Sequence, residues 1–410
     1  MSSTRPRRAV LGALLAMFAT SPGQTFCLSG FNESLGKSLD LDSTELAGAY
    51  LAGTLLSAAC LTHAGRLADR IGPRHMIAVA SVGLALSAIG LSMVQGILAL
   101  TFAFFGLRFF GQGTLTLASS HALALRFEKN LGAVEGLRGA TVSAAIATTP
   151  QIAVLSIHAF GWRSAAWVLG CGAASIGLFA AYGLLDSDLN RQEHQAVKRP
   201  PSGPGSSVPV PPVGRQFNLV EARRTTSFWT LLGCTAYTAT VLTAVHFHLQ
   251  AILRGDFPEG PGLSEAAAAS TFVSFAGLGL ASTLFGGLLV DRLHPSKLLA
   301  LAMALIGTGA GLMSMADSVT LAHTAMGVMG LGHGLGGAVS APTLARFFGR
   351  AHHGAIRGAS GTAAVAGSAA GPFLLSAAGG PLGGMGASLW LCAGLAIPLV
   401  VAALCLRRPQ

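Results

Sequence analysis

The sequence predicts an all-α integral membrane protein with twelve transmembrane helices in two pseudo-symmetric six-helix bundles. Three observations support this fold class. Hydrophobic residues make up 51% of the chain and charged residues only 10%, whereas a soluble domain is about 25% charged. The apolar residues gather in twelve spans of about 20 residues, the length that crosses a bilayer as a helix. Short motifs recur in both halves of the chain, which indicates an internal duplication.

The duplication divides the chain near its middle. Four pairs of motifs occur in the same order in both halves, at offsets that drift only from 222 to 219 residues. The pairs are Asp69-Arg70 with Asp291-Arg292, Gly111-Gln112-Gly113 with Gly332-His333-Gly334, Arg126-Phe127 with Arg346-Phe347, and Arg138-Gly139 with Arg357-Gly358. An ordered series of this kind is typical of two copies of one membrane unit.

The twelve apolar spans define the expected helices in chain order. They cover residues 9–30, 44–64, 76–95, 98–122, 133–157, 163–185, 227–250, 266–289, 297–316, 319–344, 357–379 and 386–406. Six spans lie on each side of a basic stretch that is rich in Pro, Gly and Ser, a composition typical of an extended linker. Polyproline recognition is the alternative role for this stretch. We expect an N-terminal bundle at 1–185, a cytoplasmic linker at 186–224 and a C-terminal bundle at 225–410.

The first span begins like a signal peptide, because Arg5, Arg7 and Arg8 precede its apolar core. Apolar residues continue past Pro22 to Phe31, however, and eleven further spans follow. We therefore expect the first span to remain in the protein as a transmembrane helix.

Lys and Arg residues set the orientation, since they concentrate in cytoplasmic loops. With both termini in the cytoplasm, 22 of the 26 Lys and Arg residues fall on the cytoplasmic side. Lys37, Arg163 and Arg254 fall outside, and Arg108 alone lies deep within a span, far from both of its ends. We expect a multi-pass protein of the cell inner (plasma) membrane with cytoplasmic N- and C-termini.

The composition argues against several other classes of function. The net charge of +10 comes from residues spaced between apolar runs, so nucleic-acid binding is not expected. The six cysteines fall inside predicted spans without the paired spacing of a metal site. The spans carry no nucleophile with its base and no paired acids at depth, and the chain has no Walker sequence. We expect no enzyme activity, no cofactor and no metal, and a monomer in the lipid bilayer.

The segment after the second span carries a family resemblance. It reads Gly65-Arg66-Leu67-Ala68-Asp69-Arg70-Ile71-Gly72-Pro73-Arg74. This matches the Gly-x-Leu-Ala-Asp-Arg-x-Gly-x-Arg pattern of the major facilitator superfamily at every fixed position, and the chain resembles that family over essentially its whole length. The resemblance implies alternating access around a central site between two bundles. Gly23-Gln24-Thr25-Phe26, together with the segment around Arg108, is most similar to the branch with monocarboxylate and oxalate-type porters.

The charged motif and its copy supply candidates for a cytoplasmic gate. An aspartate beside arginines can form a breakable ionic latch, and the glycines permit close helix approach and unusual backbone angles. The alternative is that these charges only follow the positive-inside bias. The candidate gating residues are Gly65, Asp69, Arg70, Arg74, Asp291 and Arg292.

Arg108 is the most informative residue inside the membrane. It lies ten positions into the fourth span, near the midplane, where a charge costs roughly 2.5–3.5 kcal/mol and usually faces a cavity or a partner. No Asp or Glu is expected at that depth, so the substrate is the candidate partner. A guanidinium suits a carboxylate well. The alternative is that Arg108 caps helix carbonyls or hydrogen-bonds Gln24 or Gln112.

Further polar residues near the midplane are also candidates for substrate contact, with interhelical hydrogen bonding as the alternative for each. His333 stands where the second half repeats Gln112 and titrates near neutral pH, so it is the candidate proton carrier. His246 and His248 are expected toward the outer mouth. The complete set of candidate substrate-binding residues is Arg108, Gln24, Gln112, Tyr50, Thr54, Gln151, Tyr237 and His333.

Together these observations favour a secondary active transporter that moves a small organic anion by alternating access. A carboxylate is the best match for the substrate, and protons are the candidate coupling ions. An efflux pump for neutral or cationic small molecules is the alternative. A membrane-embedded receptor or enzyme is a third class, which the missing catalytic groups argue against.

Overall fold

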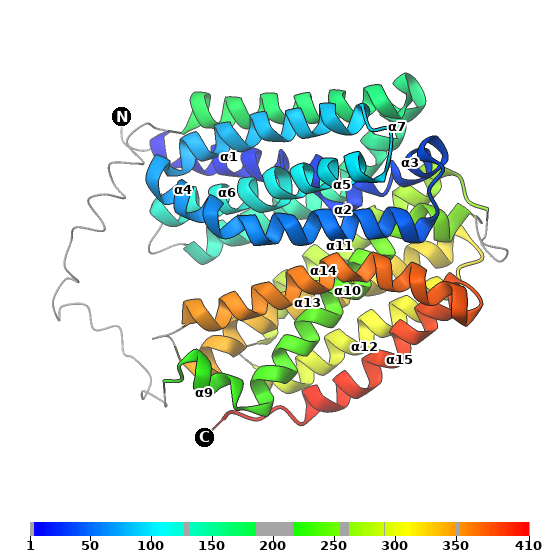
Figure 1. The fold of residues 1–410 in the computed structure, drawn as a ribbon. Coiled ribbons are helices and arrows are strands. Elements are labelled where there is room, and N and C mark those ends of the chain that lie inside the picture. The colour runs from blue at the N-terminus through cyan, green and yellow to red at the C-terminus, as the bar shows by residue number, and fades with distance from the viewer. Residues whose placement is uncertain are drawn as a thin grey trace. The chain divides into compact units, whose positions relative to one another are not determined.

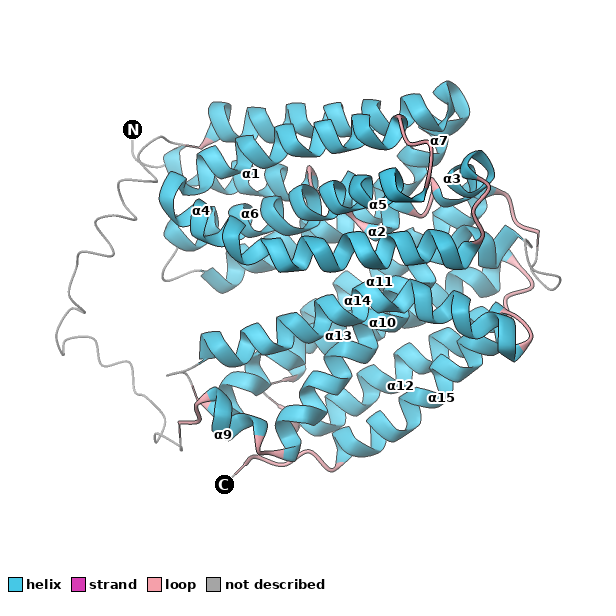
Figure 2. Ribbon diagram, viewed as in Figure 1, coloured by secondary structure: helices cyan, strands magenta, loops and turns pink. Residues whose placement is uncertain are grey.

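The computed structural model describes residues 4–126, 131–185, 216–254, 262–290, 292–349 and 353–409. These residues are mostly helical, and short loops join the helices (Figures 1 and 2). The chain divides into two compact units, Met1–Ser207 and Val208–Gln410. They are termed the N-terminal unit and the C-terminal unit.

The N-terminal unit starts with a broken helix and continues with long ones. Two of its helices, α4 and α7, each join two helical segments, because Gly72 (φ 79°) and Gly161 (φ 75°) interrupt the helical backbone. Positive φ values of this size favour glycine. The elements are α1 (Thr4–Phe18), η1 (Ser21–Gly23), α2 (Thr25–Leu28), α3 (Asn32–Leu39), α4 (Ser43–Ser92), α5 (Ile97–Gly106), η2 (Leu107–Leu115), α6 (Thr116–Arg126), α7 (Leu131–Phe179) and η3 (Ala180–Leu184).

In its described residues, the C-terminal unit has one short helix followed by six long ones. Its first long helix runs without interruption through 29 residues, in contrast to the broken first helix of the N-terminal unit. The elements are α9 (Leu219–Arg223), α10 (Thr226–Arg254), α11 (Glu265–Leu289), α12 (Pro295–Ser314), α13 (Val319–Phe348), α14 (His353–Leu382) and α15 (Met385–Leu404).

Nine segments of the described chain are long and apolar enough to cross a membrane. One of them, Gly136–Leu184, contains two helices because Gly161 divides it. The broken helix at 4–28 and the 30-residue α13 complete the set of twelve. The expected all-α fold class with twelve transmembrane helices is therefore confirmed.

One boundary differs from the expectation in a way that bears on the gate. The sequence predicts that the second helix ends at residue 64, but the structure continues it to residue 71. The charged motif is therefore helical as far as Ile71 rather than a loop, and Gly72 and Pro73 lead into the next helix. Hydropathy underestimates such a helix, because charged side chains lower it without breaking the backbone.

Two short helices also lie outside the predicted spans. Helix α3 follows the first span, and α9 lies in the part of the expected linker that the structure describes, 216–224. Residues 186–215 of that linker lie outside the described residues. Polar segments of this length carry no apolar period, so hydropathy alone does not predict their helices.

Candidate functional site

The first transmembrane helix breaks at the Pro22-Gly23 step. Helix α1 ends at Phe18, and the Ser21 hydroxyl donates a hydrogen bond of 2.6 Å to the Phe18 carbonyl. After one 3₁₀ turn, Gln24 adopts an extended conformation (φ −94°, ψ 148°) before α2 begins. An extended residue interrupts the helical hydrogen-bond ladder, so the Gly23 carbonyl becomes available to a side chain.

This break lies directly against the π-helix η2. A Cβ atom on Gly23 would stand only 2.2 Å from the carbonyl oxygen of Leu107, and a Cβ atom on Gly111 would stand 2.8 Å from the Gly23 Cα. Both glycines therefore let the two backbones touch, as small residues do at membrane helix contacts. π-Helical turns frequently mark functional sites, and this one positions Arg108 beside the break.

Arg108 reaches into the break from η2. Its side chain is buried, with 2% of its surface exposed. Nη1 donates to the Gly23 carbonyl at 3.2 Å and to the Thr25 hydroxyl at 3.3 Å. The guanidinium carbon lies 5.1 Å from the centre of the Tyr50 ring, within cation–π range. These described contacts are all with neutral groups.

Tyr50 completes the cluster from α4. Its hydroxyl and the Thr25 hydroxyl are 2.8 Å apart, and its ring packs edge-on against Phe104 at 5.8 Å. Thr25 thus links the Tyr50 hydroxyl to the Arg108 guanidinium. We term Gly23, Thr25, Tyr50 and Arg108 the arginine site. One contact in this site corresponds to the alternative role of Arg108, the capping of helix carbonyls. The guanidinium donates to the Gly23 carbonyl, which the helix break has freed.

The remaining candidates of the N-terminal unit make fewer described contacts. Gln24 donates from Nε2 to the Thr20 hydroxyl at 3.2 Å rather than to Arg108. Among the described residues, the buried Thr54 hydroxyl and the buried Gln112 Oε1 have no hydrogen-bond partner. Gln151 is half-buried and follows Pro150 inside α7. Buried polar atoms without partners are costly, so Thr54 and Gln112 remain candidates for substrate contact.

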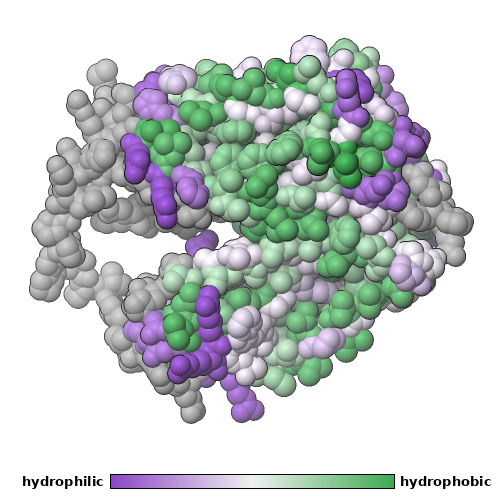
Figure 3. Space-filling model, viewed as in Figure 1, coloured by the Kyte–Doolittle hydropathy of each residue, from purple (hydrophilic) through white to green (hydrophobic). Residues whose placement is uncertain are grey.

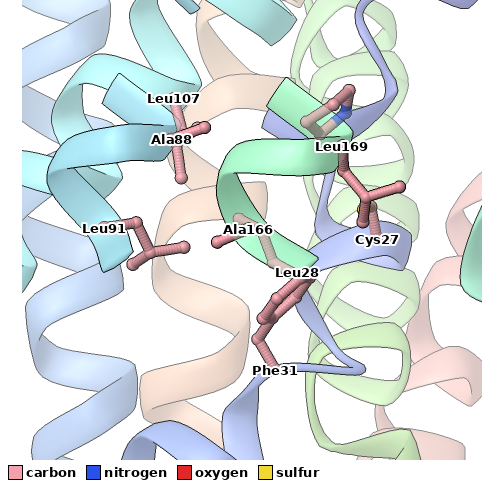
Figure 4. A pocket seen from close by; sticks show the side chains of 9 residues that line it. Cys27, Leu28, Phe31, Ala88, Leu91, Leu107, Ala166 and Leu169 are labelled. Atoms are coloured by element: carbon pink, nitrogen blue, oxygen red, sulfur yellow. The ribbon is translucent and has the colours of Figure 1, made fainter. Parts of the chain in front are cut away.

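A small cavity lies near this site in the N-terminal unit (Figure 4). Its free space is only about 10 Å³, which holds at most about one water molecule. Figure 4 shows the apolar side chains of Cys27, Leu28, Leu91 and Ala166 around it. The cavity is too small and too apolar to hold an organic substrate.

The C-terminal unit contains a different buried cluster. The ring of His333 stacks on Phe275 with centroids 5.6 Å apart, and the ring of His246 meets the same phenyl ring edge-on at 4.6 Å. His246 also contacts Phe272 at 5.1 Å, and its buried Nε2 has no hydrogen-bond partner among the described residues. We term these four residues the histidine site. From the sequence, His246 is expected toward the outer mouth and His333 near the midplane. In the structure the rings of both residues contact Phe275.

Two other polar side chains of α10 hold neighbouring helices. Tyr237 donates its hydroxyl hydrogen to the carbonyl of Cys392 on α15 at 2.9 Å. His248 Nε2 lies 2.9 Å from the carbonyl of Pro372 on α14, so this nitrogen carries the hydrogen. Tyr237 thus makes an interhelical hydrogen bond, which is the alternative that the sequence left open for it.

The candidate gate is only partly described. Arg74 donates from Nε to the Ala181 carbonyl at 3.1 Å, and its guanidinium lies 5.1 Å from the Tyr182 ring centre. Among the described residues, a Cβ atom on Gly65 would meet Leu117 at 3.9 Å, an ordinary contact distance, so these residues show no close approach there. Arg70 and Arg292 are exposed. The Asp69 side chain and the whole of Asp291 lie outside the described residues.

A contact that the sequence did not predict joins Arg346 to Val290, which is next to the candidate gating residue Asp291 in the chain. The Arg346 Nη1 donates to the carbonyl of Val290 at 2.9 Å, at the C-terminal end of α11. A cation is favourable at a helix C-terminus, where carbonyl groups lack partners. The signal was present in the sequence, since Arg346-Phe347 is one of the repeated pairs.

Twelve apolar helices with buried polar clusters in both units define a polytopic membrane protein. Comparison with protein families identifies it further. The family model of the Major Facilitator Superfamily matches residues 10–257, more than half of the chain. The chain therefore belongs to the Major Facilitator Superfamily, and this membership indicates a transporter rather than an enzyme.

Solved structures of transporters share the fold. A bacterial homolog of the human lysosomal transporter Spinster, in an inward-facing and unoccupied conformation, is 16% identical, with a TM-score of 0.68 over 99% of this chain and 95% of that one. A point mutant of the nucleoside transporter NupG is 11% identical, with a TM-score of 0.73 over 97% of this chain and 99% of that one. No curated protein sequence matches significantly. At these identities the likeness concerns the fold alone.

Proposed function

We propose that this protein is a secondary transporter that carries a small organic anion across the cell inner membrane by alternating access, and that the arginine site binds its carboxylate. The proposal rests on the burial of Arg108 and on the groups that its guanidinium contacts. A guanidinium stays charged inside proteins, and Arg108 is buried against a neutral carbonyl, a hydroxyl and an aromatic ring.

The lengths of the Arg108 hydrogen bonds support exchange with a ligand. Bonds from a charged nitrogen to a carboxylate are usually about 2.7–2.9 Å long, whereas the two described bonds of Arg108 measure 3.2 and 3.3 Å. A carboxylate would accept from two guanidinium nitrogens in a bidentate geometry and would place a negative charge against the positive one. It would therefore bind more strongly than the Gly23 carbonyl and the Thr25 hydroxyl.

The resemblance to monocarboxylate and oxalate-type porters involves the same residues. It rests on the segment 23–26 and on the helix around Arg108, and these segments supply the Gly23 carbonyl, the Thr25 hydroxyl and the guanidinium. We therefore assign the substrate to small mono- or dicarboxylates.

We further propose that His333 carries the coupling proton. Its ring lies on a phenyl ring rather than in a described hydrogen bond, and the titratable His246 approaches that phenyl ring from another helix. A protonated imidazole on the face of Phe275 gains cation–π stabilisation. This proton would cross the membrane with the anion. Both termini would lie in the cytoplasm, as the 22 basic residues on that side favour.

Thermal stability of the purified protein with a ligand panel tests the anion assignment. We expect small mono- and dicarboxylates to raise the melting temperature, because a ligand that binds only the folded state stabilises it, by about 2.7 kcal/mol at 100 times its Kd. Neutral and cationic compounds of similar size serve as matched controls. If a cation or a neutral compound stabilises the protein and the carboxylates do not, the anion assignment is wrong, whereas the transporter class is unaffected.

A further inference from the structure

Four exposed arginines gather at one end of the C-terminal unit, away from the histidine site. Arg223 is the last residue of α9 and Arg224 follows it, and Arg407 and Arg408 follow α15. The Ser227 hydroxyl donates to the Arg407 carbonyl at 2.6 Å, so these two segments, far apart in sequence, lie side by side. Figure 3 shows hydrophilic side chains concentrated where α9 and the C-terminus lie in Figure 1.

The arginine pair at the end of α9 has a fixed backbone. Asn218 and Glu221 form a reciprocal capping box at the start of α9, which engages the Glu221 carboxylate. The Phe217 amide donates to the Phe348 carbonyl at 3.0 Å, and the two rings pack edge-on at 5.7 Å. The short helix is thereby attached to the end of α13. A fixed backbone presents its charges at a fixed place, unlike a free loop.

Large apolar side chains border the arginines. Val220 is 62% exposed, Trp229 is 59% exposed and Leu404 is 55% exposed. The Trp229 indole donates to the Arg223 carbonyl at 2.7 Å, which holds its ring beside the arginine pair. Tryptophan with its apolar ring in lipid and its N–H toward polar groups is typical of the membrane–water interface.

We propose that Arg223, Arg224, Arg407 and Arg408 form a binding site for the phosphate headgroup of an anionic phospholipid such as phosphatidylglycerol. Arginine forks bind phosphate oxygens, and the exposed rings and aliphatic groups of Trp229, Val220 and Leu404 contact the glycerol and acyl region. Basic clusters next to transmembrane helices attract anionic lipids. The proposed orientation places this site in the cytoplasmic leaflet, and the binding itself does not depend on that orientation.

Quenching of Trp229 fluorescence by brominated lipids tests the site. The protein has four tryptophans, so a variant with Trp162, Trp167 and Trp390 changed to Phe reports on Trp229 alone. In vesicles we expect brominated phosphatidylglycerol to quench Trp229 more strongly than brominated phosphatidylcholine at equal mole fraction. A matched variant that keeps only Trp390, which is 53% exposed near the start of α15, should show no preference.

Two double variants identify the residues responsible. Arg223→Gln with Arg224→Gln, and Arg407→Gln with Arg408→Gln, should each weaken the preference for phosphatidylglycerol by about tenfold or more. Arg7→Gln with Arg8→Gln removes an exposed pair from the N-terminal unit and should leave the preference unchanged. Native mass spectrometry of the unmodified protein with both lipids provides a second measurement without substitutions.

The outcomes separate three cases. Preferential quenching that inorganic phosphate at millimolar concentration leaves intact supports a lipid headgroup site. Preference abolished by inorganic phosphate alone would assign the arginines to free phosphate and overturn the lipid proposal. Equal quenching by both lipids would contradict the proposal, and so would loss of the preference in the Arg7 and Arg8 control as well. Either result would mean that the four arginines follow the positive-inside bias and do not form a specific lipid site. None of these results bears on whether the arginine site binds an anion.

Discussion

The N-terminal unit buries a permanent charge, whereas the C-terminal unit places titratable rings in its corresponding helices. Gln112 lies one helical turn after Arg108, and its counterpart at an offset of 221 residues is His333. Arg108 contacts a carbonyl, a hydroxyl and Tyr50, and His333 contacts Phe275. The two units therefore share corresponding helices but differ in their buried groups, and the proposed division into anion binding by one unit and proton transfer by the other rests on this difference.

The first helix of each unit accounts for much of this difference. In the N-terminal unit it breaks at Gly23 and presents a backbone carbonyl to Arg108. In the C-terminal unit, α10 runs unbroken from Thr226 to Arg254, so its interior carbonyls remain in the helical ladder. The position that corresponds to Gln24 at an offset of 222 residues is His246. In its described residues, α10 therefore presents no freed carbonyl of the kind that Gly23 offers to Arg108.

Removal of the Arg108 guanidinium should have the largest effect. Loss of one partner of a buried charged pair costs about 2–5 kcal/mol, so Arg108→Gln should weaken carboxylate binding by about 30-fold to several thousand-fold. Arg108→Lys keeps the charge but loses the bidentate fork, and should retain intermediate affinity. The measurement is ligand affinity and melting temperature on the same purified samples.

A structural Arg108 would behave differently. Both variants would then melt at lower temperature while the affinity of the folded fraction stayed near the wild-type value. That result would mean that Arg108 does not bind the carboxylate. The proposed difference between an anion-binding N-terminal unit and a C-terminal unit without this function would then be lost. Arg163→Gln provides a control for the loss of a guanidinium, since Arg163 donates to the Ser92 carbonyl at 2.8 Å in the same unit and lies outside the arginine site.

Substitution of His333 should have an intermediate effect. If this residue carries the proton, His333→Gln should abolish accumulation driven by a pH gradient, which at one pH unit amounts to about tenfold. Downhill exchange of the substrate should continue, because the arginine site is unchanged. The measurement is uptake into proteoliposomes with and without the gradient.

His323→Gln is the matched control in the same helix. Both ring nitrogens of His323 already lie within hydrogen-bond distance of hydroxyl groups, Ser274 at 2.7 Å and Ser270 at 3.1 Å. We expect this variant to retain accumulation driven by the gradient. Unaltered accumulation in His333→Gln would exclude His333 as the carrier and would favour uniport, anion exchange or coupling elsewhere.

Most of the fold could be predicted from hydropathy and repetition. Helices α10, α11, α12 and α15 begin within two residues of their predicted starts, because apolar spans bounded by Pro, Gly or charged residues have definite ends. The extension of the second helix through Arg70 could not be predicted in this way. Charges favour water, and a helix can continue into water without an apolar pattern.

The sites were only partly predictable. A lone Arg108 in an apolar span was visible in the sequence, and so was the Pro22-Gly23 break. The contact between them joins residues 85 positions apart and depends on the approach of two backbones at Gly23 and Gly111. The convergence of His246 and His333 on Phe275 likewise depends on the packing of three helices. Periodicity in one helix does not specify its neighbours.

The smallest expected effect concerns the Tyr50 hydroxyl, which is 2.8 Å from the Thr25 hydroxyl. Tyr50→Phe keeps the ring that faces Arg108 and removes one buried hydrogen bond, which typically costs about 0.5–1.5 kcal/mol. Tyr237→Phe removes a similar bond, of 2.9 Å to the Cys392 carbonyl, in the other unit.

Both tyrosine variants should therefore lose a similar amount of thermal stability. Only Tyr50→Phe should also weaken carboxylate binding, by about threefold to tenfold, because its hydroxyl orients the Thr25 hydroxyl that accepts from Arg108. Isothermal titration and thermal melting of the two variants, side by side, provide the comparison. Equal affinity in both would show that Tyr50 and Thr25 hold the helix break without assisting Arg108, and the arginine site would then consist of the guanidinium alone. Weaker binding in Tyr237→Phe would instead mean that the Tyr237 hydroxyl also contributes to binding, and the arginine site would not account for recognition of the anion by itself.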